Sequence, residues 1–345
     1  MPERIVIIGD GAMATVCAIM LAENGHAVRI WSAFPAAAAE FARNRENKRF
    51  LPGFAIPEGV EVTADDASAF ADVDLAISAV PTQFTRPVWN RLRGFCRHDL
   101  PICSVAKGIE NKTLLRPTQI LLDVLSGGKP ADQAQTLPPR PVATLSGPSI
   151  APEVASRLPA SVTVASSDDG LARRVQQAIS RPYFRVYTNN DVVGVELAGA
   201  TKNVIAIAAG ILDGLHAGDN AKAALLTRGL VEITRLGVAL GAQAETFAGL
   251  AGFGDLVTTC ISPVGRNRSF GQAIGQGKGV AETLAATNSV VEGVATTESV
   301  VELAAKAGVD MPITQAVYDV VFAGRRAADA IADLMNRPLK AEGGR

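Results

Sequence analysis

The segment RIVIIGDGAMATVCAIMLAENGHAVRIW, residues 4–31, constrains the fold more than any other part of the chain. It begins with a short β-branched run and turns at Gly9 and Gly11. Apolar spacing then predicts a helix over 12–23, and a second strand follows at 27–31. Two strands joined through a helix form a βαβ unit, in which the strands are parallel. The chain therefore begins as an α/β protein.

Further buried strands are predicted beyond this unit, with helical stretches between most of them. They cover residues 73–79, 102–106, 142–146, 161–165 and 184–188. Such alternation implies right-handed crossovers and a parallel, doubly wound sheet of the Rossmann type.

The pattern becomes helical after residue 190 and stays so to about residue 335, with glycine loops expected at 249–254 and 275–279. We therefore expect a dinucleotide-binding Rossmann domain over 1–190 and an all-helical substrate-binding domain over 191–338. A disordered tail is expected at 339–345.

Composition excludes several classes of protein. The formal net charge is −1 and the pI is about 6.3, which gives no electrostatic footprint for nucleic acid. The four cysteines show no zinc-type spacing, so we expect no metal site and a reduced protein. The first strand begins near residue 4, which leaves no room for a targeting segment and predicts a cytoplasmic location. The apolar stretch 192–212 contains Glu196 and Lys202, so it is interpreted as a core helix and not a membrane span.

The glycine turn carries a dinucleotide-binding pattern, Gly9-Asp10-Gly11-Ala12-Met13-Ala14. Its first glycine would make the tight turn, and its second would let the pyrophosphate approach the helix N-terminus. The pattern alone is weak, but its position between a strand and a helix favours a dinucleotide over a generic turn.

The end of the second strand bears on the choice between NAD and NADP. The second strand ends in Trp31-Ser32-Ala33-Phe34, without the acidic residue that holds the ribose of NAD. The missing acid removes an obstacle to NADP, so NADPH is favoured slightly.

Polar motifs follow three of the predicted strands: Val80-Pro81-Thr82, Lys107-Gly108-Ile109-Glu110 and Gly147-Pro148-Ser149. In open α/β sheets this edge binds the ligand. Lys107 could equally be a solvated lysine, and a serine after Gly-Pro is commonly a helix N-cap.

Lys202 lies inside the apolar segment GVELAGATKNVIAIAAG, where burial disfavours its charged form. Glu196 is not at helical i, i+4 spacing from Lys202, so a distant acid is needed. Asp255 in GLAGFGDL is the candidate partner. One hypothesis is that Lys202 exchanges a proton with an alcohol or carbonyl oxygen, and the alternative is a buried structural ion pair.

Two further motifs carry charge. The loop GRNRSFG contains Arg266 and Asn267 and would suit a phosphate or carboxylate, although a basic surface loop is equally compatible. Glu292 in VVEG stands alone in an apolar setting.

With these residues in place, the sequence resembles the bacterial-type NAD(P)-dependent sn-glycerol-3-phosphate dehydrogenases over nearly its whole length. The resemblance rests on SAVPT, AKGIE, LSGPSIAPEVA, GVELAGATKNVIAIAAGILDGL, TFAGLAGFGDLVTTC, GRNRSFG and VVEGVATT. It implies a Rossmann domain, a helical substrate domain, a homodimer, and interconversion of glycerol 3-phosphate with dihydroxyacetone phosphate for phospholipid synthesis.

The resemblance also implies residue roles. Lys202 is the general acid/base, supported by Lys107 and Asp255. The substrate is bound by Lys107, Gly147, Ser149, Lys202, Asp255, Gly265, Arg266 and Asn267. The cofactor is bound by Gly9, Gly11, Ala12, Met13, Ala33, Lys107, Ala151, Arg266, Val290 and Glu292.

The sequence departs from the family at the ligand-binding positions. Ala12, Met13 and Ala14 replace a small polar residue, an aromatic residue and glycine, and Gly265 replaces a serine. Ala33 stands where a basic residue or a histidine is common. These departures keep two alternatives open: a nucleotide-binding sensor or scaffold with little turnover, and a dehydrogenase of a hydroxy acid or polyol.

Overall fold

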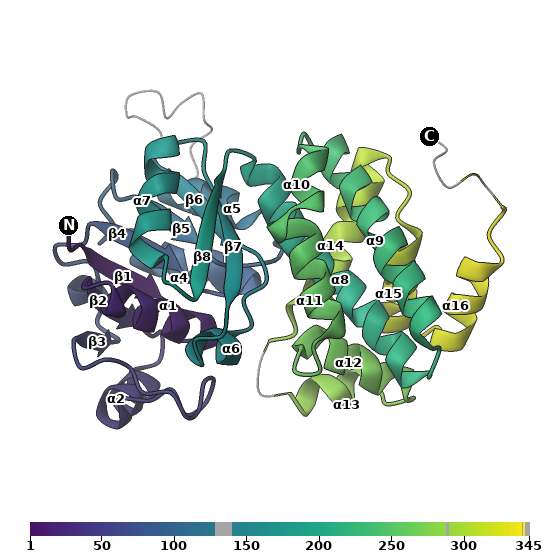
Figure 1. The fold of residues 1–345 in the computed structure, drawn as a ribbon, viewed down its shortest axis with the longest axis horizontal. Helices are drawn as coiled ribbons and strands as arrows, with labels where there is room; N and C mark the ends of the chain where they lie inside the picture. Colours follow the sequence, from purple (N-terminus) through teal and green to yellow (C-terminus); the bar gives the residue numbers. More distant parts are fainter. Residues whose placement is uncertain (128–139, 288–289, 340, 342–345) are drawn as a thin grey trace.

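The computed structural model describes residues 1–127, 140–287, 290–339 and 341. Within them, one eight-stranded sheet has the order β3-β2-β1-β4-β5-β6-β7-β8 (Figure 1). The strands are β1 (Arg4–Ile8), β2 (Ala27–Trp31), β3 (Val60–Thr63), β4 (Leu75–Ser78), β5 (Ile102–Ser104), β6 (Val142–Ser146), β7 (Ala160–Ala165) and β8 (Phe184–Asn189).

The sheet is parallel except between β6 and β7, which pair antiparallel with Leu145 opposite Val164. The expected parallel, doubly wound sheet is therefore confirmed, with one antiparallel pair that was not expected. Parallel neighbours need a long crossover that brings the chain back to the edge where the previous strand began. The connection from β6 to β7 contains only the short helix α6 (Ala151–Ala155), so β7 runs back antiparallel to β6. The sequence interpretation also missed β3, a four-residue edge strand with polar residues at alternate positions.

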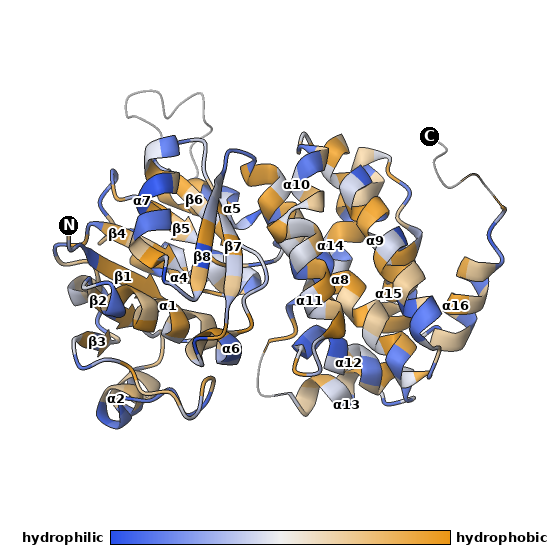
Figure 2. Ribbon diagram, viewed as in Figure 1, coloured by the Kyte–Doolittle hydropathy of each residue, from blue (hydrophilic) through white to orange (hydrophobic). Residues whose placement is uncertain are grey.

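Both faces of the sheet are covered by helices, as the alternation along β1 shows. Ile5 and Ile7 belong to a core with α1 (Ala12–Glu23) and α7 (Asp169–Ile179), whereas Val6 and Ile8 belong to a core with α4 (Thr82–Leu92) and α5 (Pro117–Leu125). Figure 2 shows β1 as largely apolar. The remaining helices of this part lie between the strands: α2 (Pro35–Asn44) and α3 (Asp66–Ala69).

The second half of the described chain is helical and surrounds α8 (Val192–Gly214). Its other helices are α9 (Asp219–Ala239), α10 (Ala244–Ala248), α11 (Asp255–Ile261), α12 (Arg266–Gly275), α13 (Val280–Ala285), α14 (Glu292–Ala307), α15 (Pro312–Phe322) and α16 (Ala327–Met335). The stretch expected as a glycine loop at 249–254 is mostly a π-helical turn, η1 (Leu250–Gly254), which leads directly into α11. Single π-helical turns of this kind are frequent at functional sites.

Helix α8 is long and apolar enough to span a membrane, but 89% of its most apolar window is buried inside the protein. It is thus a core helix in this structure. Its N-terminus is capped by Asp191, whose Oδ1 accepts a 2.8 Å hydrogen bond from the Gly194 amide. Of the tail expected at 339–345, residues 340 and 342–345 lie outside the described part of the chain.

Candidate active site

The glycine turn after β1 is shaped for a close ligand. Gly9 has a φ of 113°, and a Cβ there would lie 2.8 Å from the carbonyl oxygen of Ala79, so only glycine fits. Gly11 is the N-cap of α1, without a side-chain capping bond, and a Cβ on it would meet nothing within 4 Å. Ala12 and Met13 follow in the first turn and are only partly buried. The open space and free amide groups at this helix N-terminus fit a dinucleotide pyrophosphate.

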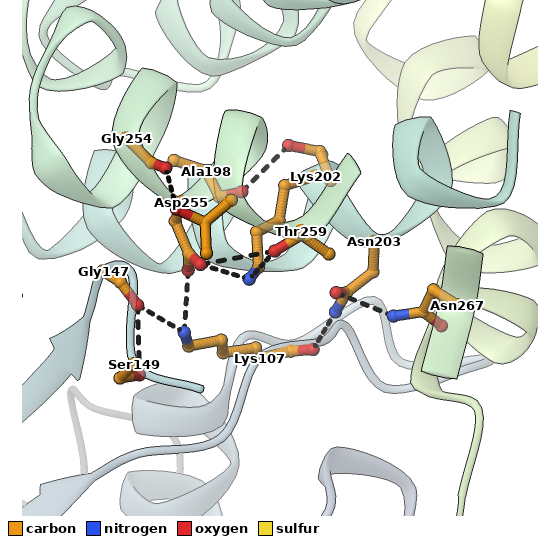
Figure 3. A network of polar contacts seen from close by, with 12 residues as sticks. Lys107, Gly147, Ser149, Ala198, Lys202, Asn203, Gly254, Asp255, Thr259 and Asn267 are labelled. Carbon is orange, nitrogen blue, oxygen red and sulfur yellow. Dashed lines mark hydrogen bonds and ion pairs between the residues drawn. The ribbon is translucent and has the colours of Figure 1, made fainter. Parts of the chain in front are cut away.

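Lys107 and Ser149 meet at the carboxyl edge of the sheet, after β5 and β6 (Figure 3). Both donate hydrogen bonds to the carbonyl oxygen of Gly147, the Lys107 Nζ at 3.0 Å and the Ser149 hydroxyl at 3.1 Å. A Cβ on Gly147 would lie 2.8 Å from Cα of Val162, so this tight approach also requires glycine. Ser149 is therefore not the helix N-cap that its sequence context suggested, since α6 begins after Ile150.

Lys202 is buried on α8 and is held by two residues of α11. Its Nζ donates to Asp255 Oδ1 at 2.5 Å and to the Thr259 hydroxyl at 2.6 Å. The other oxygen of Asp255 accepts a 2.7 Å hydrogen bond from Lys107. The carboxylate of Asp255 therefore joins Lys202, on the helical side, to Lys107 at the sheet edge (Figure 3).

Burial and charge set the protonation of this cluster. The side chains of Lys202 and Asp255 are only 6% and 3% exposed. Burial lowers the pKa of Lys202 to about 8, although the Asp255 carboxylate opposes the shift. Burial would raise the pKa of Asp255, but the Lys107 and Lys202 ammonium groups outweigh it and hold that pKa below its usual range. With both lysines protonated, the three side chains carry a net charge of about +1, which favours an anionic ligand.

Glu196, the other charged residue in α8, faces a different partner. Its carboxylate accepts hydrogen bonds from Arg116 at 2.5 Å and from the amide and hydroxyl of Thr118 at 2.8 and 2.7 Å. Arg116 is the N-cap of α5, so Glu196 ties a sheet-side helix to α8. The helical spacing predicted that Glu196 would not pair with Lys202, and the structure confirms this.

An amide chain connects the lysine cluster to α12 and α14. Asn203 donates from Nδ2 to the carbonyl oxygen of Lys107 at 3.0 Å, and its own Oδ1 accepts from Asn267 at 2.9 Å. The Asn267 Oδ1 then accepts from the amide of Gly293 at 2.9 Å. These hydrogen bonds fix Asn267 beside Asn203, the residue that follows Lys202 on α8.

The segment expected as a basic loop is the N-terminal part of helix α12. Gly265 is its N-cap, and Arg266 is an exposed first-turn residue, followed by the buried Asn267. The nearby Arg268 is engaged elsewhere, because its Nε donates to Asp213 at 2.6 Å. No acidic residue lies in this first turn, so the helix dipole and Arg266 both favour an anion there.

Glu292 is partly buried at the start of α14, where its carboxylate accepts a 3.2 Å hydrogen bond from the amide of Thr82. Burial raises its pKa, and the positive charge of Arg266 counts among the opposing influences. Val290, two residues before Glu292, is exposed. Ala151 is the first residue of α6. Ala33 lies two residues after the end of β2.

Three residues outside the predicted set join the site: Asn203, Thr259 and Thr82. Asn203 adjoins Lys202 in the sequence, and Thr259 is one helical turn after Asp255, so each had a weak signal. The strand-end position of Thr82 was noted, but its contact with Glu292 joins residues 210 positions apart, which no local pattern reveals.

Comparison with known proteins identifies the class of this dehydrogenase-like arrangement. Residues 4–172 match the model of the N-terminal domain of NAD-dependent glycerol-3-phosphate dehydrogenase, and residues 191–332 match the model of its C-terminal domain. The chain belongs to this family of oxidoreductases.

Individual relatives agree over the full length. The glycerol-3-phosphate dehydrogenase [NAD(P)+] of Citrifermentans bemidjiense is 49% identical over 343 residues, which is 99% of this chain and all of the relative. The enzyme of the same name from Prosthecochloris aestuarii is 45% identical over 98% of this chain and 99% of its own. The crystal structure of glycerol-3-phosphate dehydrogenase from Coxiella burnetii has a TM-score of 0.91 at 35% identity, covering 97% of this chain and 99% of that one.

Proposed function

We propose that this protein interconverts sn-glycerol 3-phosphate and dihydroxyacetone phosphate with a nicotinamide dinucleotide. The observation that carries the proposal is the buried Lys202, whose Nζ lies 2.5 Å from Asp255 while Lys107 holds the other oxygen of that carboxylate. A merely structural ion pair would need one lysine, and the second leaves an excess positive charge in the cluster.

Lys202 serves as the general acid/base. Its pKa of about 8 lets the ammonium group donate a proton to the oxygen of the carbonyl substrate, and lets the neutral amine accept the proton from the alcohol. The nicotinamide ring, when bound, supplies or accepts the hydride. Asp255 orients Lys202 and stabilises its charged form, and Thr259 accepts a second hydrogen bond from Nζ.

The remaining substrate residues position the three-carbon phosphate. Arg266 and the first-turn amides of α12, which starts after Gly265, would bind the phosphate, and Asn267 contributes its remaining amide hydrogen. Lys107, Gly147 and Ser149 line the substrate from the sheet edge.

In this proposal Gly9, Gly11, Ala12 and Met13 would hold the pyrophosphate of the cofactor, and Ala33 would lie near its adenosine ribose. Val290 and Glu292 would contact the nicotinamide nucleotide, and Ala151 would contact the cofactor through its backbone. Lys107 and Arg266 would also contact the cofactor. The expectation from the end of β2 alone favours NADPH over NADH.

The wider assignment keeps the sequence expectations. The Rossmann domain covers residues 1–190 and the helical substrate domain covers 191–338. The protein would work in the cytoplasm as a homodimer and supply glycerol 3-phosphate for phospholipid synthesis.

The test is oxidation of NADPH and NADH with dihydroxyacetone phosphate by the wild type and by Lys202→Ala. We expect turnover by the wild type and a loss of about 10²- to 10⁴-fold in the variant, which is the usual contribution of a general acid/base. Binding of a dinucleotide without turnover across phosphorylated three-carbon substrates would favour the sensor alternative. An unchanged KM in Arg266→Ala would contradict the phosphate site and favour a substrate without a phosphate.

A further inference from the structure

The end of β2 lacks an acidic residue of its own, but the glycine turn brings one to it. Asp10 stands between Gly9 and Gly11, and its Oδ2 accepts a 2.6 Å hydrogen bond from the hydroxyl of Ser32. Ser32 directly follows β2, the place where dinucleotide-binding folds carry the acid for the ribose hydroxyls, about 20 residues beyond the glycine turn. A carboxylate thus reaches the ribose position from a different element.

The backbone around Asp10 is fixed on both sides. The amide of Gly9 donates to the carbonyl oxygen of Trp31 at 2.9 Å, which joins the turn to the end of β2. The side chain of Asn47 donates to the carbonyl oxygen of Asp10 at 2.7 Å and to the Thr15 hydroxyl at 2.8 Å. The carboxylate is therefore held in place before any ligand arrives, with Ser32 occupying only one of its two oxygens in the described part of the chain.

Arg91, a cation beside the end of β2, is already paired. Arg91 of α4 lies over the ring of Trp31 at 5.1 Å, and its Nη1 is 3.4 Å from the carbonyl oxygen of Ala33. Its guanidinium forms two hydrogen bonds of 2.7 Å with the carboxylate of Asp66. A phosphate on the ribose would have to compete with Asp66 for Arg91 while it approached the negative charge of Asp10.

We propose that Asp10 determines the choice of cofactor: its carboxylate accepts the adenosine ribose hydroxyls of NAD(H) and repels the 2′-phosphate of NADP(H). The inference rests on the proposed function only in requiring that the chain binds a nicotinamide dinucleotide. It reverses the preference for NADPH, which depended on β2 alone. An acid held at the end of β2 by Ser32 can accept the ribose hydroxyls as an acid on β2 itself would.

The test is equilibrium binding of NADH and of NADPH, followed by the fluorescence of the reduced nicotinamide, so that no turnover is needed. The wild type should bind NADH at least about tenfold more tightly than NADPH, corresponding to about 1.4 kcal/mol. Asp10→Asn keeps the size and the acceptor for Ser32 but removes the charge, and should raise NADPH affinity about tenfold. Asp72→Asn is the control, because it makes the same chemical change just before the amino end of β4, away from the carboxyl edge of the sheet. It should leave both dissociation constants unchanged.

Three results would overturn the inference. They are equal or tighter binding of NADPH by the wild type, an unchanged ratio in Asp10→Asn, and a selective loss of NADPH binding in Arg91→Gln. If Asp10→Asn fails to fold, competition by ADP and by adenosine 2′,5′-bisphosphate on the wild type decides the same question, with ADP expected to compete better. Binding of both dinucleotides with equal affinity would contradict this inference alone, whereas binding of neither would contradict the proposed function as well.

Discussion

A Cβ on Gly271 would lie 2.0 Å from the carbonyl oxygen of Ile207, so α12 and α8 touch backbone to backbone. Gly210, Gly214 and Gly275 show the same close approach along the pair of helices. Because Lys202 lies on α8 and Arg266 begins α12, this contact sets the separation between the proposed proton donor and the proposed phosphate site.

Gly271→Ala should therefore damage stability and substrate binding together. The added methyl group must push α12 away from α8, at a cost near the upper end of the roughly 1–3 kcal/mol typical of overpacking. Urea unfolding should show the lost stability, and KM for dihydroxyacetone phosphate should rise. Gly94→Ala is the matched control, since a Cβ on Gly94 would meet nothing within 4 Å and should leave both quantities unchanged.

The two directions of the reaction should respond oppositely to pH. Burial lowers the pKa of Lys202 to about 8, and reduction needs the ammonium form whereas oxidation needs the neutral amine. The rate of dihydroxyacetone phosphate reduction should fall as pH rises through about 8, and the rate of glycerol 3-phosphate oxidation should rise over the same range. Profiles of kcat/KM in both directions measure this, and profiles that rise together would contradict the assignment.

Asp255→Asn should displace these profiles along the pH axis and not only lower them. The Asp255 carboxylate raises the pKa of Lys202 against the effect of burial, so its removal should lower that pKa further. At a pH above this pKa, a lower pKa leaves a smaller fraction of Lys202 in the ammonium form. The rate of reduction, which needs that form, should therefore fall most. Thr259→Ser retains the hydroxyl that accepts from Lys202 and should keep the wild-type profile. A lower rate with an unmoved profile would mean that Asp255 acts only structurally.

Glu196→Ala should be among the most destabilising single changes at the contact between α5 and α8. It leaves Arg116, whose side chain is 15% exposed, without its carboxylate, and breaking such a buried pair costs about 3–5 kcal/mol. Glu196→Gln keeps an acceptor for the Thr118 amide and should lose less. Denaturant unfolding separates the two variants, and equal losses would show that the charge alone matters.

The sequence predicted the parts of the fold that local pattern controls. The boundaries of β1, α1, β2 and β6 coincide with the predicted segments, because apolar period and glycine turns are local signals. The strand β7 was predicted at 161–165, but its antiparallel direction was not, since strand direction depends on the length and route of a connection. The expected loop at 249–254 forms a helical turn because the glycine-rich chain packs tightly: a Cβ on Gly252 would lie 2.1 Å from the carbonyl oxygen of Phe247.

The candidate site shows the same limit. A lysine in an apolar helix and an acid after a glycine turn were enough to predict that Lys202 and Asp255 meet. The sharing of Asp255 between Lys202 and Lys107 was not predicted, because it depends on how the sheet edge meets the helices. The contact of Asp10 with Ser32 was missed for a similar reason, since the ribose acid was sought only along the second strand.

The glycine contacts between α8 and α12 also constrain motion. Helices in backbone contact cannot slide without breaking many close contacts at once, so Lys202, Asn203 and Asn267 should move as one rigid body. Any closing or opening during turnover would then occur between this body and the sheet edge that carries Lys107. Two hydrogen bonds to Lys107 cross that boundary, one to the carboxylate of Asp255 and one from the side chain of Asn203, so the position of Lys107 is coupled to this rigid body.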